Sequence, residues 1–407
     1  MPNQHPLPLN GIRVLDATHI VAGPFCSQIL ADMGAEVIKI ERPRTGDLIR
    51  GRGPYVTKED GQRISSRYIG LNRNKKSVTL DLRNPRCKAA FEEMVKVSDV
   101  LLDNWGPGAF RRLGLGYDYL RELNPGLIYA SITGYGDSDE LRGPYSNWPA
   151  NNLAIQGMAG WMELTGEPGR PPQSVGDNIG DSIPGVWSAL GVVLALRSRE
   201  QTGQGQHVDM AMYECMVLHT LSNMYGYEAS GELFTRDWSR LANAGITFRA
   251  SDGYVIMAGA RVPERWQNLW KLVGRNDLAD NPDYLAPSDG DFIHEHVVPA
   301  LEEWSQSLPK WEVAGKITEL GFSMGVAQNT EDLANCPQLE ARDMFVETGD
   351  TAGGPFRSLR TPVRLLDCAP IEPETAPQLG QHNREVLCSL GGLTEEELSA
   401  LEEEGAV

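Results

Sequence analysis

The sequence has few cysteines and histidines, and neither type is grouped. The six cysteines are scattered, and no two of them are spaced as Cys-x-x-Cys. The seven histidines include no pair spaced as His-x-x-x-His. This distribution argues against a disulfide framework or a structural zinc site, and it indicates free thiols in a reducing compartment.

Long apolar runs and common phosphate-binding motifs are also missing. No stretch of eighteen apolar residues occurs, and residues 1–8 have neither a basic nor an apolar region. We therefore expect no membrane span, no secretory signal and a cytoplasmic location. No Gly-x-x-x-x-Gly-Lys-Ser/Thr is present, which excludes a P-loop, and Gly114-Leu-Gly116 lacks the third glycine of a dinucleotide fingerprint.

Positive charge is in deficit. The chain has 37 Lys and Arg against 55 Asp and Glu, a formal net charge of −18. Proteins that bind nucleic acid or an anionic membrane surface need a basic face, so neither partner is expected. A local cluster of Arg and Lys would still suffice for a small anionic ligand.

Apolar runs alternate with amphipathic segments through the first 210 of the 407 residues. Strands are predicted at 12–15, 37–40, 78–82, 100–102, 127–132 and 206–212, and the most apolar helix at 183–198. This alternation predicts a mostly parallel sheet covered by helices on both faces. We predict a large α/β domain at 1–224, a linker at 225–243, a small α+β domain at 244–325, and a return linker with the C-terminal part of the large domain at 326–407.

Shorter signals mark the ends of other elements. Ser251-Asp252-Gly253 between two apolar runs predicts a hairpin turn, whereas 321–378 reads as irregular, proline-bearing chain. Thr394 and Glu397 form a capping box that opens an acidic C-terminal helix.

Two carboxylates lie just before the predicted 183–198 helix. Asp177 and Asp181 are both flanked by glycines. Either could cap the helix by accepting backbone N–H groups. A carboxylate among small neighbours could instead attack an acyl carbon as a nucleophile. Spacing alone does not choose between these interpretations.

Three basic clusters stand out against the acidic background: Arg42-Pro-Arg44, Arg73-Asn-Lys-Lys76 and Arg111-Arg112. Each lies beside a predicted strand, where an open α/β sheet binds its ligand near the carboxyl ends of the strands. They are either ordinary surface charge or, taken together, a site for a polyanionic ligand.

Several motifs in order resemble those of the family III CoA transferases across nearly the whole chain. They include Leu9-Asn-Gly-Ile-Arg-Val-Leu-Asp16, Leu30-Ala-Asp-Met-Gly-Ala-Glu-Val-Ile-Lys-Ile-Glu-Arg-Pro43, Asn104-Trp-Gly-Pro-Gly108 and Thr133-Gly-Tyr-Gly136. The resemblance implies a large Rossmann-like domain with a smaller α+β domain, in a homodimer of two interlocked rings. It implies a coenzyme A (CoA) thioester as substrate, with no metal and no tightly bound cofactor.

The family's nucleophile pattern is Gly-Asp, three residues and then glycine. Gly180-Asp181-Ser-Ile-Pro-Gly185 fits this pattern, whereas Asp177 has no glycine four residues later. The resemblance therefore implies that Asp181 attacks the donor acyl-CoA. An aspartyl anhydride and then an aspartyl-CoA thioester would follow before CoA passes to an acceptor acid.

The resemblance also implies contacts to CoA or substrate along the large domain. The matching positions are Val21, Ala22, Arg42, Leu71, Asn72, Arg73, Asn74, Lys75, Asn104, Trp105, Arg112, Gly134, Tyr135 and Asn151. Val21 replaces a glutamine of formyl-CoA transferase, and the glycine run of that enzyme is absent from 244–262, where Ala258-Gly-Ala260 is a short substitute. Both departures argue against formate and oxalate as substrates.

Two other functions remain open at this point. The racemase branch of the family exchanges an α-proton with a histidine and an aspartate, but Asn151 stands at the histidine position and cannot act as a base. A non-catalytic CoA-binding protein is the other, although the intact Gly-Asp pattern speaks against it. Arg50, Arg52 and Tyr55 could hold a second carboxylate, which would favour a dicarboxylate acid, or could be surface or CoA-contact residues.

Overall fold

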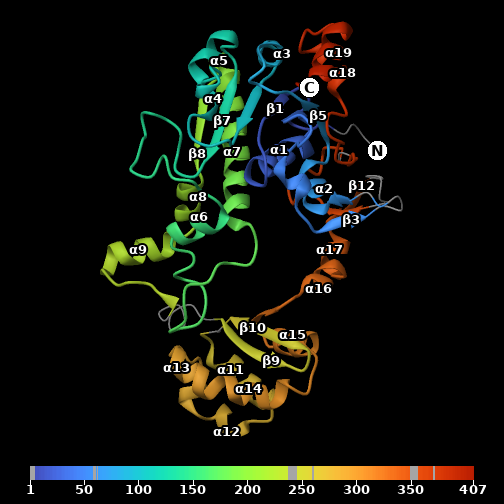
Figure 1. The fold of residues 1–407 in the computed structure, drawn as a ribbon. Helices are drawn as coiled ribbons and strands as arrows, with labels where there is room; N and C mark the ends of the chain where they lie inside the picture. Colours follow the sequence, from blue (N-terminus) through green and yellow to red (C-terminus); the bar gives the residue numbers. More distant parts are fainter. Residues whose placement is uncertain are drawn as a thin grey trace. The chain divides into compact units, whose positions relative to one another are not determined.

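The structure is a computed structural model that describes residues 5–57, 61, 63–236, 245–258, 261–348, 356–369 and 372–407. Its contacts divide the chain into two compact units. The large unit comprises 1–161, 174–221 and 340–407, and the small unit comprises 162–173 and 222–339. Both ends of the chain therefore fold into the large unit (Figure 1).

A six-stranded sheet forms the centre of the large unit. Its strands are β1 (Arg13–Asp16), β2 (Glu36–Glu41), β5 (Lys75–Thr79), β6 (Val100–Asp103), β7 (Ile128–Thr133) and β8 (His207–Ala211). They lie in the order β5-β2-β1-β6-β7-β8, and every pairing is parallel. This is the strand order of a doubly wound sheet, so the predicted fold class is confirmed. The connections reverse direction between β1 and β6, which opens a crevice at the carboxyl ends of these two strands.

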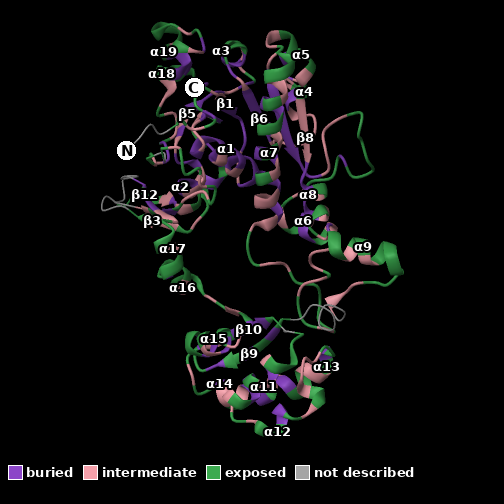
Figure 2. Cartoon of the chain, turned by 180° about the vertical axis from the view of Figure 1, so that it is seen from behind, coloured by how far each residue is buried: buried purple, intermediate pink, exposed green. Residues whose placement is uncertain are grey.

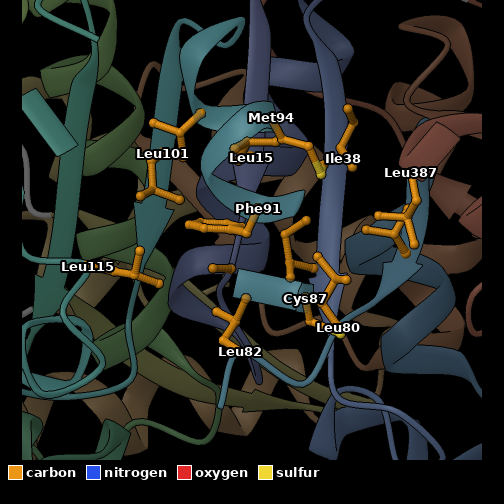
Figure 3. Packing of buried hydrophobic residues seen from close by; sticks show 14 of the residues in the cluster. Leu15, Ile38, Leu80, Leu82, Cys87, Phe91, Met94, Leu101, Leu115 and Leu387 are labelled. Carbon is orange, nitrogen blue, oxygen red and sulfur yellow. The ribbon is translucent and has the colours of Figure 1, made fainter. Parts of the chain in front are cut away.

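Helices cover both faces of this sheet. One face is packed by α1 (Ala22–Asp32), α6 (Asn152–Met158), α7 (Ile179–Thr202) and α8 (Met212–Leu218). The other is packed by α3 (Pro85–Lys96), α5 (Tyr117–Leu123), α18 (Asn383–Ser389) and α19 (Glu395–Glu404). Phe91 and Met94 of α3 lie against Leu15, Ile38 and Leu101 of the strands (Figure 3). Most of these strands have the colour of buried residues in Figure 2, as expected of a parallel sheet sandwiched between helices, whereas β8 at the edge is mostly intermediate.

Smaller elements complete the large unit. The short strands among them were not predicted from the sequence. These smaller elements are η1 (Leu48–Gly51), β3 (Tyr55–Thr57), β4 (Arg63–Ser65), α2 (Ser66–Asn72), α4 (Ala109–Arg112), β12 (Phe345–Thr348) and β13 (Phe356–Leu359). The pairs β3–β4 and β12–β13 are antiparallel. The second pair lies in the range that was predicted to be irregular. The Thr394–Glu397 capping box is confirmed at the start of α19.

The long helix α7 begins four residues earlier than predicted. It runs from Ile179 and carries Pro184 inside it, so Asp181 is the third residue of the helix and does not precede it. A proline this close to a helix start removes only one backbone hydrogen bond, so the helix continues through it. By length and composition α7 could cross a membrane. Core helices of globular domains pass the same test, and α7 packs against α1, α8, β7 and β8.

The small unit is an α+β fold of its own. Its antiparallel sheet has the order β11-β10-β9, from β9 (Ile246–Ala250), β10 (Gly253–Ala258) and β11 (Ser323–Val326). The turn between β9 and β10 confirms the predicted hairpin. Three helices bury Trp266 and Trp270 against this sheet, namely α11 (Pro263–Leu272), α14 (Val298–Ser305) and α15 (Lys310–Thr318).

The remaining helices are short and lie between these elements. They are α9 (Leu221–Ser230), α12 (Asn276–Ala279), η2 (Pro282–Tyr284), α13 (Gly290–Phe292), the π-helix η3 (Ile293–Val297), α16 (Thr330–Ala334) and α17 (Pro337–Ala341). Residues 225–230, expected in a linker, are helical in α9. The rest of that predicted linker from 237 onward, together with Gly259 and Ala260, lies outside the described residues.

Candidate active site

Asp181 is a half-buried carboxylate in the first turn of α7. Its backbone N–H donates to the carbonyl of Asn178 at 3.0 Å. Its side chain has no hydrogen-bond or ion-pair partner among the residues that the structure describes. Burial raises the pKa of Asp181 to about 6, because the charged form loses hydration without gaining a compensating partner. A carboxylate in this state keeps its lone pairs available for attack on an electrophile.

Asp177, the other candidate, lies in a different environment. It is exposed, and its Oδ1 accepts the backbone N–H of Asn178 at 2.7 Å. The same oxygen accepts the Asn178 side-chain amide at 3.3 Å. These contacts are typical of a turn and engage Oδ1 of Asp177, whereas neither carboxylate oxygen of Asp181 has a partner among the described residues. Geometry therefore separates the two aspartates, which spacing alone could not.

The first turn of α7 is attached to α6 by side-chain amides. Asn152 Oδ1 accepts the backbone N–H of Gly180 at 2.9 Å, and Asn152 Nδ2 donates to the carbonyl of Asp177 at 3.3 Å. Gln156 is fully buried, and its Nε2 donates to Asn152 Oδ1 at 2.9 Å. The sequence analysis did not single out Asn152 or Gln156. Their only sequence signal is two amide side chains four residues apart, which face the same side of a helix.

Val21 and Ala22 are buried where α1 begins, beside α7. A Cβ on Gly185 would lie 2.8 Å from the carbonyl oxygen of Ala22, so only glycine allows this approach. Gly185 is four residues after Asp181, one helical turn along. The start of α1 is thus placed next to the helical turn that follows Asp181.

Gly134 and Tyr135 follow β7, and they reach the start of α6. A Cβ on Gly134 would lie 2.3 Å from the Cβ of Ala150. The Tyr135 ring packs against the rings of Tyr145, Trp148 and Tyr213. Asn151 is exposed, and its side chain caps α6 by accepting the N–H of Ala154 at 3.0 Å. Gly134, Tyr135 and Asn151 therefore share the carboxyl edge of the sheet with the start of α7.

Asn104 and Trp105 follow β6 at the reversal point of the sheet. Both ends of the Asn104 amide bond the backbone of His19, each at 2.9 Å, which ties the loop after β6 to the loop after β1. The Arg42 guanidinium lies 5.9 Å from the centre of the Trp105 ring. A small pocket adjoins these groups, lined by Thr18, His19, Ile40, Glu41, Arg42, Gly46, Asp47, Leu48 and Trp105.

The loop after β1 is held by buried charges that the sequence analysis did not assign. Asp47 accepts the N–H of Ile20 at 3.0 Å and forms an ion pair with Lys39 at 2.9 Å. Lys39 also donates to the carbonyl of Thr18 at 2.9 Å. Ile20 has a φ of 71°, a left-handed conformation that is unfavourable for a β-branched residue. Fixed conformations of this kind occur at binding loops, where the surroundings maintain them.

Arg42 and Arg112 are the exposed cations among the predicted contact residues. Neither forms an ion pair within the described part of the chain, although Arg112 donates to the carbonyl of Pro107 at 3.0 Å. Arg111, by contrast, pairs with Asp137 and Asp139. Arg42 follows β2 and Arg112 ends α4, so both lie on the carboxyl side of the sheet.

The predicted contacts from Leu71 to Lys75 lie elsewhere. Residues 71–74 precede β5 and Lys75 begins it, at the amino ends of the strands, so the expectation that this cluster lies at the carboxyl edge is wrong. Arg73 is buried in an ion pair with Asp32. Asn74 bonds Asp32 at 2.9 Å, and Leu71 packs against a small apolar cluster. The sequence could not show this, because a basic run looks the same whether it is exposed or paired.

Lys75 is fully enclosed. Its Nζ lies 3.0 Å from Asp16 Oδ2 and also donates to Ser27, Asn72 and the carbonyl of Pro24. Burial lowers the pKa of Lys75 to about 8, although the Asp16 carboxylate opposes that change. The ammonium has no hydrogen left for a ligand.

The residues considered for a second carboxylate are also engaged. Arg50 pairs with Glu41 at 2.7 Å, and its guanidinium lies 3.7 Å from the centre of the Tyr68 ring. The Tyr55 hydroxyl donates to the carbonyl of Gly51 at 2.6 Å, while Arg52 is exposed. Of these three side chains, Arg52 alone is exposed and has no side-chain bond within the described residues.

Comparison with known proteins identifies the family. The model of CoA-transferase family III matches residues 9–383. The chain is 35% identical to the formyl-CoA:oxalate CoA-transferase of Streptomyces avermitilis, over 98% of this chain and 99% of that protein. It is 34% identical to the succinyl-CoA:mesaconate CoA-transferase of Haloarcula hispanica, over 94% and 96% respectively. A solved CAIB/BAIF family protein from Brucella suis is 32% identical with a TM-score of 0.85, covering 95% of this chain and 100% of that one.

The chain belongs to CoA-transferase family III. It is therefore a transferase that acts on CoA thioesters, as the motifs predicted.

Proposed function

We propose that this enzyme transfers CoA from an acyl-CoA, with succinyl-CoA as the first donor to test, to a small dicarboxylic acid through covalent intermediates on Asp181. The observation that carries the proposal is the half-buried Asp181 carboxylate at the carboxyl edge of the sheet, which has no partner among the described residues. Relatives named for succinyl-CoA with mesaconate and for succinate with glutarate support the choice of acids. Val21, in place of glutamine, argues against oxalate.

The reaction needs no net proton transfer. Asp181 attacks the thioester carbonyl, the C–S bond breaks, and CoA leaves as the thiolate from an aspartyl anhydride. The thiolate then attacks the aspartyl carbonyl, which releases the donor acid and leaves an aspartyl-CoA thioester. The acceptor carboxylate attacks this thioester and expels CoA again. The thiolate finally takes the acceptor acyl group and frees Asp181.

Different residues at the carboxyl edge of the sheet bind different parts of CoA. Among the predicted contact residues, Arg42 and Arg112 are exposed cations with no ion pair to any described residue, so they suit the phosphates of CoA. Val21, Ala22, Gly134 and Tyr135 adjoin the start of α7, where the thioester has to lie. Asn104 holds the loop after β1. Residues 71–75 lie at the amino ends of the strands and stabilise the fold. Asn151 caps α6 and supplies no base, so proton exchange is not part of this proposal.

A matched pair of substitutions tests the nucleophile. Asp181→Asn keeps the shape of the side chain but cannot form an anhydride, so CoA exchange between succinyl-CoA and labelled succinate should fall at least about a thousandfold. Asp177→Asn, four residues away on the exposed turn, should stay within about twofold of wild type. Enzyme incubated with acyl-CoA and then treated with hydroxylamine should show a mass change on Asp181.

Two results would contradict the proposal. One is full exchange activity in Asp181→Asn, together with an unmodified Asp181 in the trapping experiment. The other is fast exchange of the α-proton of a 2-methylacyl-CoA without any acceptor acid, which would indicate the racemase chemistry. Succinyl-CoA turnover with a panel of dicarboxylic and monocarboxylic acids would then identify the acceptor.

A further inference from the structure

The start of α7 is capped by a side chain from another helix. Its own N-cap residue, Asn178, makes no side-chain hydrogen bond to the first turn. The acceptor for the Gly180 N–H is instead Asn152 Oδ1 of α6, at 2.9 Å. A helix usually satisfies these first N–H groups with the side chain of its own N-cap residue.

Gln156 fixes the position of this external cap. It is fully buried, its Nε2 donates to Asn152 Oδ1 at 2.9 Å, and its Oε1 accepts the N–H of Val175 at 2.9 Å. Asn152 Nδ2 donates to the carbonyl of Asp177 at 3.3 Å. Both amides therefore have partners at each end, and they attach α6 to the segment that leads into α7 (Figure 1). A buried polar network with every group paired holds one geometry.

Gly180 permits this arrangement. A Cβ at this position would lie 2.6 Å from the backbone oxygen of Asn152 and 2.9 Å from Asn152 Oδ1. Any larger residue would push α6 away from the first turn of α7. The glycine before the nucleophile thus has a packing reason that does not involve substrate.

The capping matters because of where Asp181 lies. An acidic residue at the third position of a helix commonly bonds backbone N–H groups of the first turn. Such bonds would stabilise the carboxylate and make it a poorer nucleophile. In this structure the Asp181 side chain accepts no hydrogen bond from any described residue.

We propose that Asn152, held by Gln156, caps α7 in place of Asp181 and thereby keeps the Asp181 carboxylate free to attack the thioester. This inference rests on the proposed role of Asp181 as the nucleophile. It makes Asn152 and Gln156 positioning residues, which act through Asp181 and do not touch the reacting atoms.

No charged neighbour accounts for the state of Asp181. Burial is the cause of its raised pKa. The elements packed against α7 carry these ionisable side chains: Cys26 and Asp32 on α1, Tyr129 on β7, His207 and Asp209 on β8, and Tyr213, Glu214 and Cys215 on α8. On the segment before α7 and on α7 itself they are Asp177, Arg197, Arg199 and Glu200, and α6 has none. A change in the pH profile can therefore be assigned to the hydrogen bonds of Asp181.

Removal of the external cap should move the pH profile in a defined direction. In Asn152→Ala the Gly180 N–H loses its acceptor, and an N–H without a partner at a helix start attracts the carboxylate of the next residue, Asp181. The acidic limb of the kcat/KM profile for acyl-CoA should then shift to lower pH by about one unit. The kcat at neutral pH should fall about tenfold or more, with KM for acyl-CoA within about twofold of wild type.

Three further variants make the test specific. Gly180→Ala displaces Asn152 by a different route and should reproduce both effects, so it decides the matter if Asn152→Ala does not fold. Asn152→Asp keeps an acceptor for the Gly180 N–H, so its acidic limb should not fall below that of wild type. Asn124→Ala removes another amide that bridges backbone groups, those of Val95, Ser98 and Gly126, and should lower stability without moving the limb.

The outcomes separate this inference from the proposed function. Suppose that Asp181→Asn is inactive, whereas Asn152→Ala and Gly180→Ala fold and keep the wild-type kcat and the wild-type acidic limb of the kcat/KM profile. The capping inference is then overturned, and the role of Asp181 as the nucleophile is retained. The inference is also overturned if Asn152→Ala and Asn124→Ala lose equal amounts of stability and kcat and neither shifts the acidic limb of the kcat/KM profile. If Asp181→Asn keeps its activity, the proposed function itself fails.

Discussion

A carboxylate that is half-buried without a partner costs folding stability, and Asp181 is such a group within the part of the chain that the structure describes. Its pKa is raised from 3.8 to about 6, so the folded chain binds more protons than the unfolded chain between these two pH values. Stability therefore falls as the pH rises through this window, and the cost is fully present above about pH 6. Active-site residues are often retained at such a cost because function requires them.

Substitution of Asp181 should therefore stabilise the protein above pH 6. One pKa unit corresponds to about 1.4 kcal/mol, so Asp181→Asn should raise the free energy of unfolding by about 2 kcal/mol at pH 7.5, after allowance for partial exposure. At pH 4 the gain should nearly vanish, because Asp181 is protonated in the folded wild type. Urea unfolding at the two pH values measures this. Equal gains at both would contradict the assignment, and Asp177→Asn serves as the control.

At the scale of elements, β5 stabilises the sheet through buried charged side chains. The charges of Lys75 and Asp16 are both fully buried, and Lys39 contributes a second positive charge beside Asp16. These groups together hold the pKa of Asp16 well below its usual range despite burial. The strand therefore depends on a buried ion pair, and loss of one member leaves the other uncompensated.

Lys75 and Arg42 should respond differently to removal. Lys75→Met should destabilise the protein by about 3 kcal/mol or more, because the buried Asp16 carboxylate loses its ion-pair partner. Arg42→Ala should leave the unfolding midpoint within about 1 °C. It should raise KM for acyl-CoA about tenfold, through the loss of one charge-assisted contact to phosphate. Thermal unfolding together with steady-state kinetics on both variants gives the comparison.

The opposite pattern would contradict this division of roles. A stable Lys75→Met enzyme with a raised KM would make Lys75 a ligand contact after all. An Arg42→Ala protein that loses stability and keeps its KM would place Arg42 in the fold.

At the scale of the whole molecule, α7 exposes an apolar stripe in the single chain. Leu194 is 60% exposed and Val186 is 51% exposed, and Leu190 and Val193 lie on the same side of the helix. An apolar stripe of this kind on a monomer usually marks an interface. A second copy of the chain, as in the homodimer that the family resemblance implies, would cover it.

The native mass and one paired substitution test the dimer. Wild type should have twice the 44.7 kDa of the chain in sedimentation equilibrium. Leu190→Glu combined with Leu194→Glu should shift the mass toward a single chain, because burial of two charges is costly. Leu141→Glu, at an exposed leucine in a loop, should leave the mass unchanged. A wild-type monomer, or a double variant that stays dimeric, would contradict this role for α7.

The sheet could be predicted closely because its strands are buried on both faces and read as continuous apolar runs. The errors lie where polar residues are buried or where a breaker is tolerated. Lys75 and Lys76 belong to β5, although their charge suggested a loop before it. The helix was predicted from its apolar residues to begin at Ile183, whereas α7 begins a turn earlier. In both cases local preference was overridden by tertiary contacts.

The sequence by itself determined the fold class and the family, and its motifs predicted Asp181 over Asp177 as the nucleophile, since motif order and apolar periodicity are local properties of the chain. Only the tertiary structure decided which basic residues are free and which are paired. It also decided that Asn152 and not Asp181 caps α7. The physical reason is distance along the chain: Lys75 meets Asp16 across 59 residues, and Gly180 meets Asn152 across 28. Such pairs exist only once the sheet and its helices have packed.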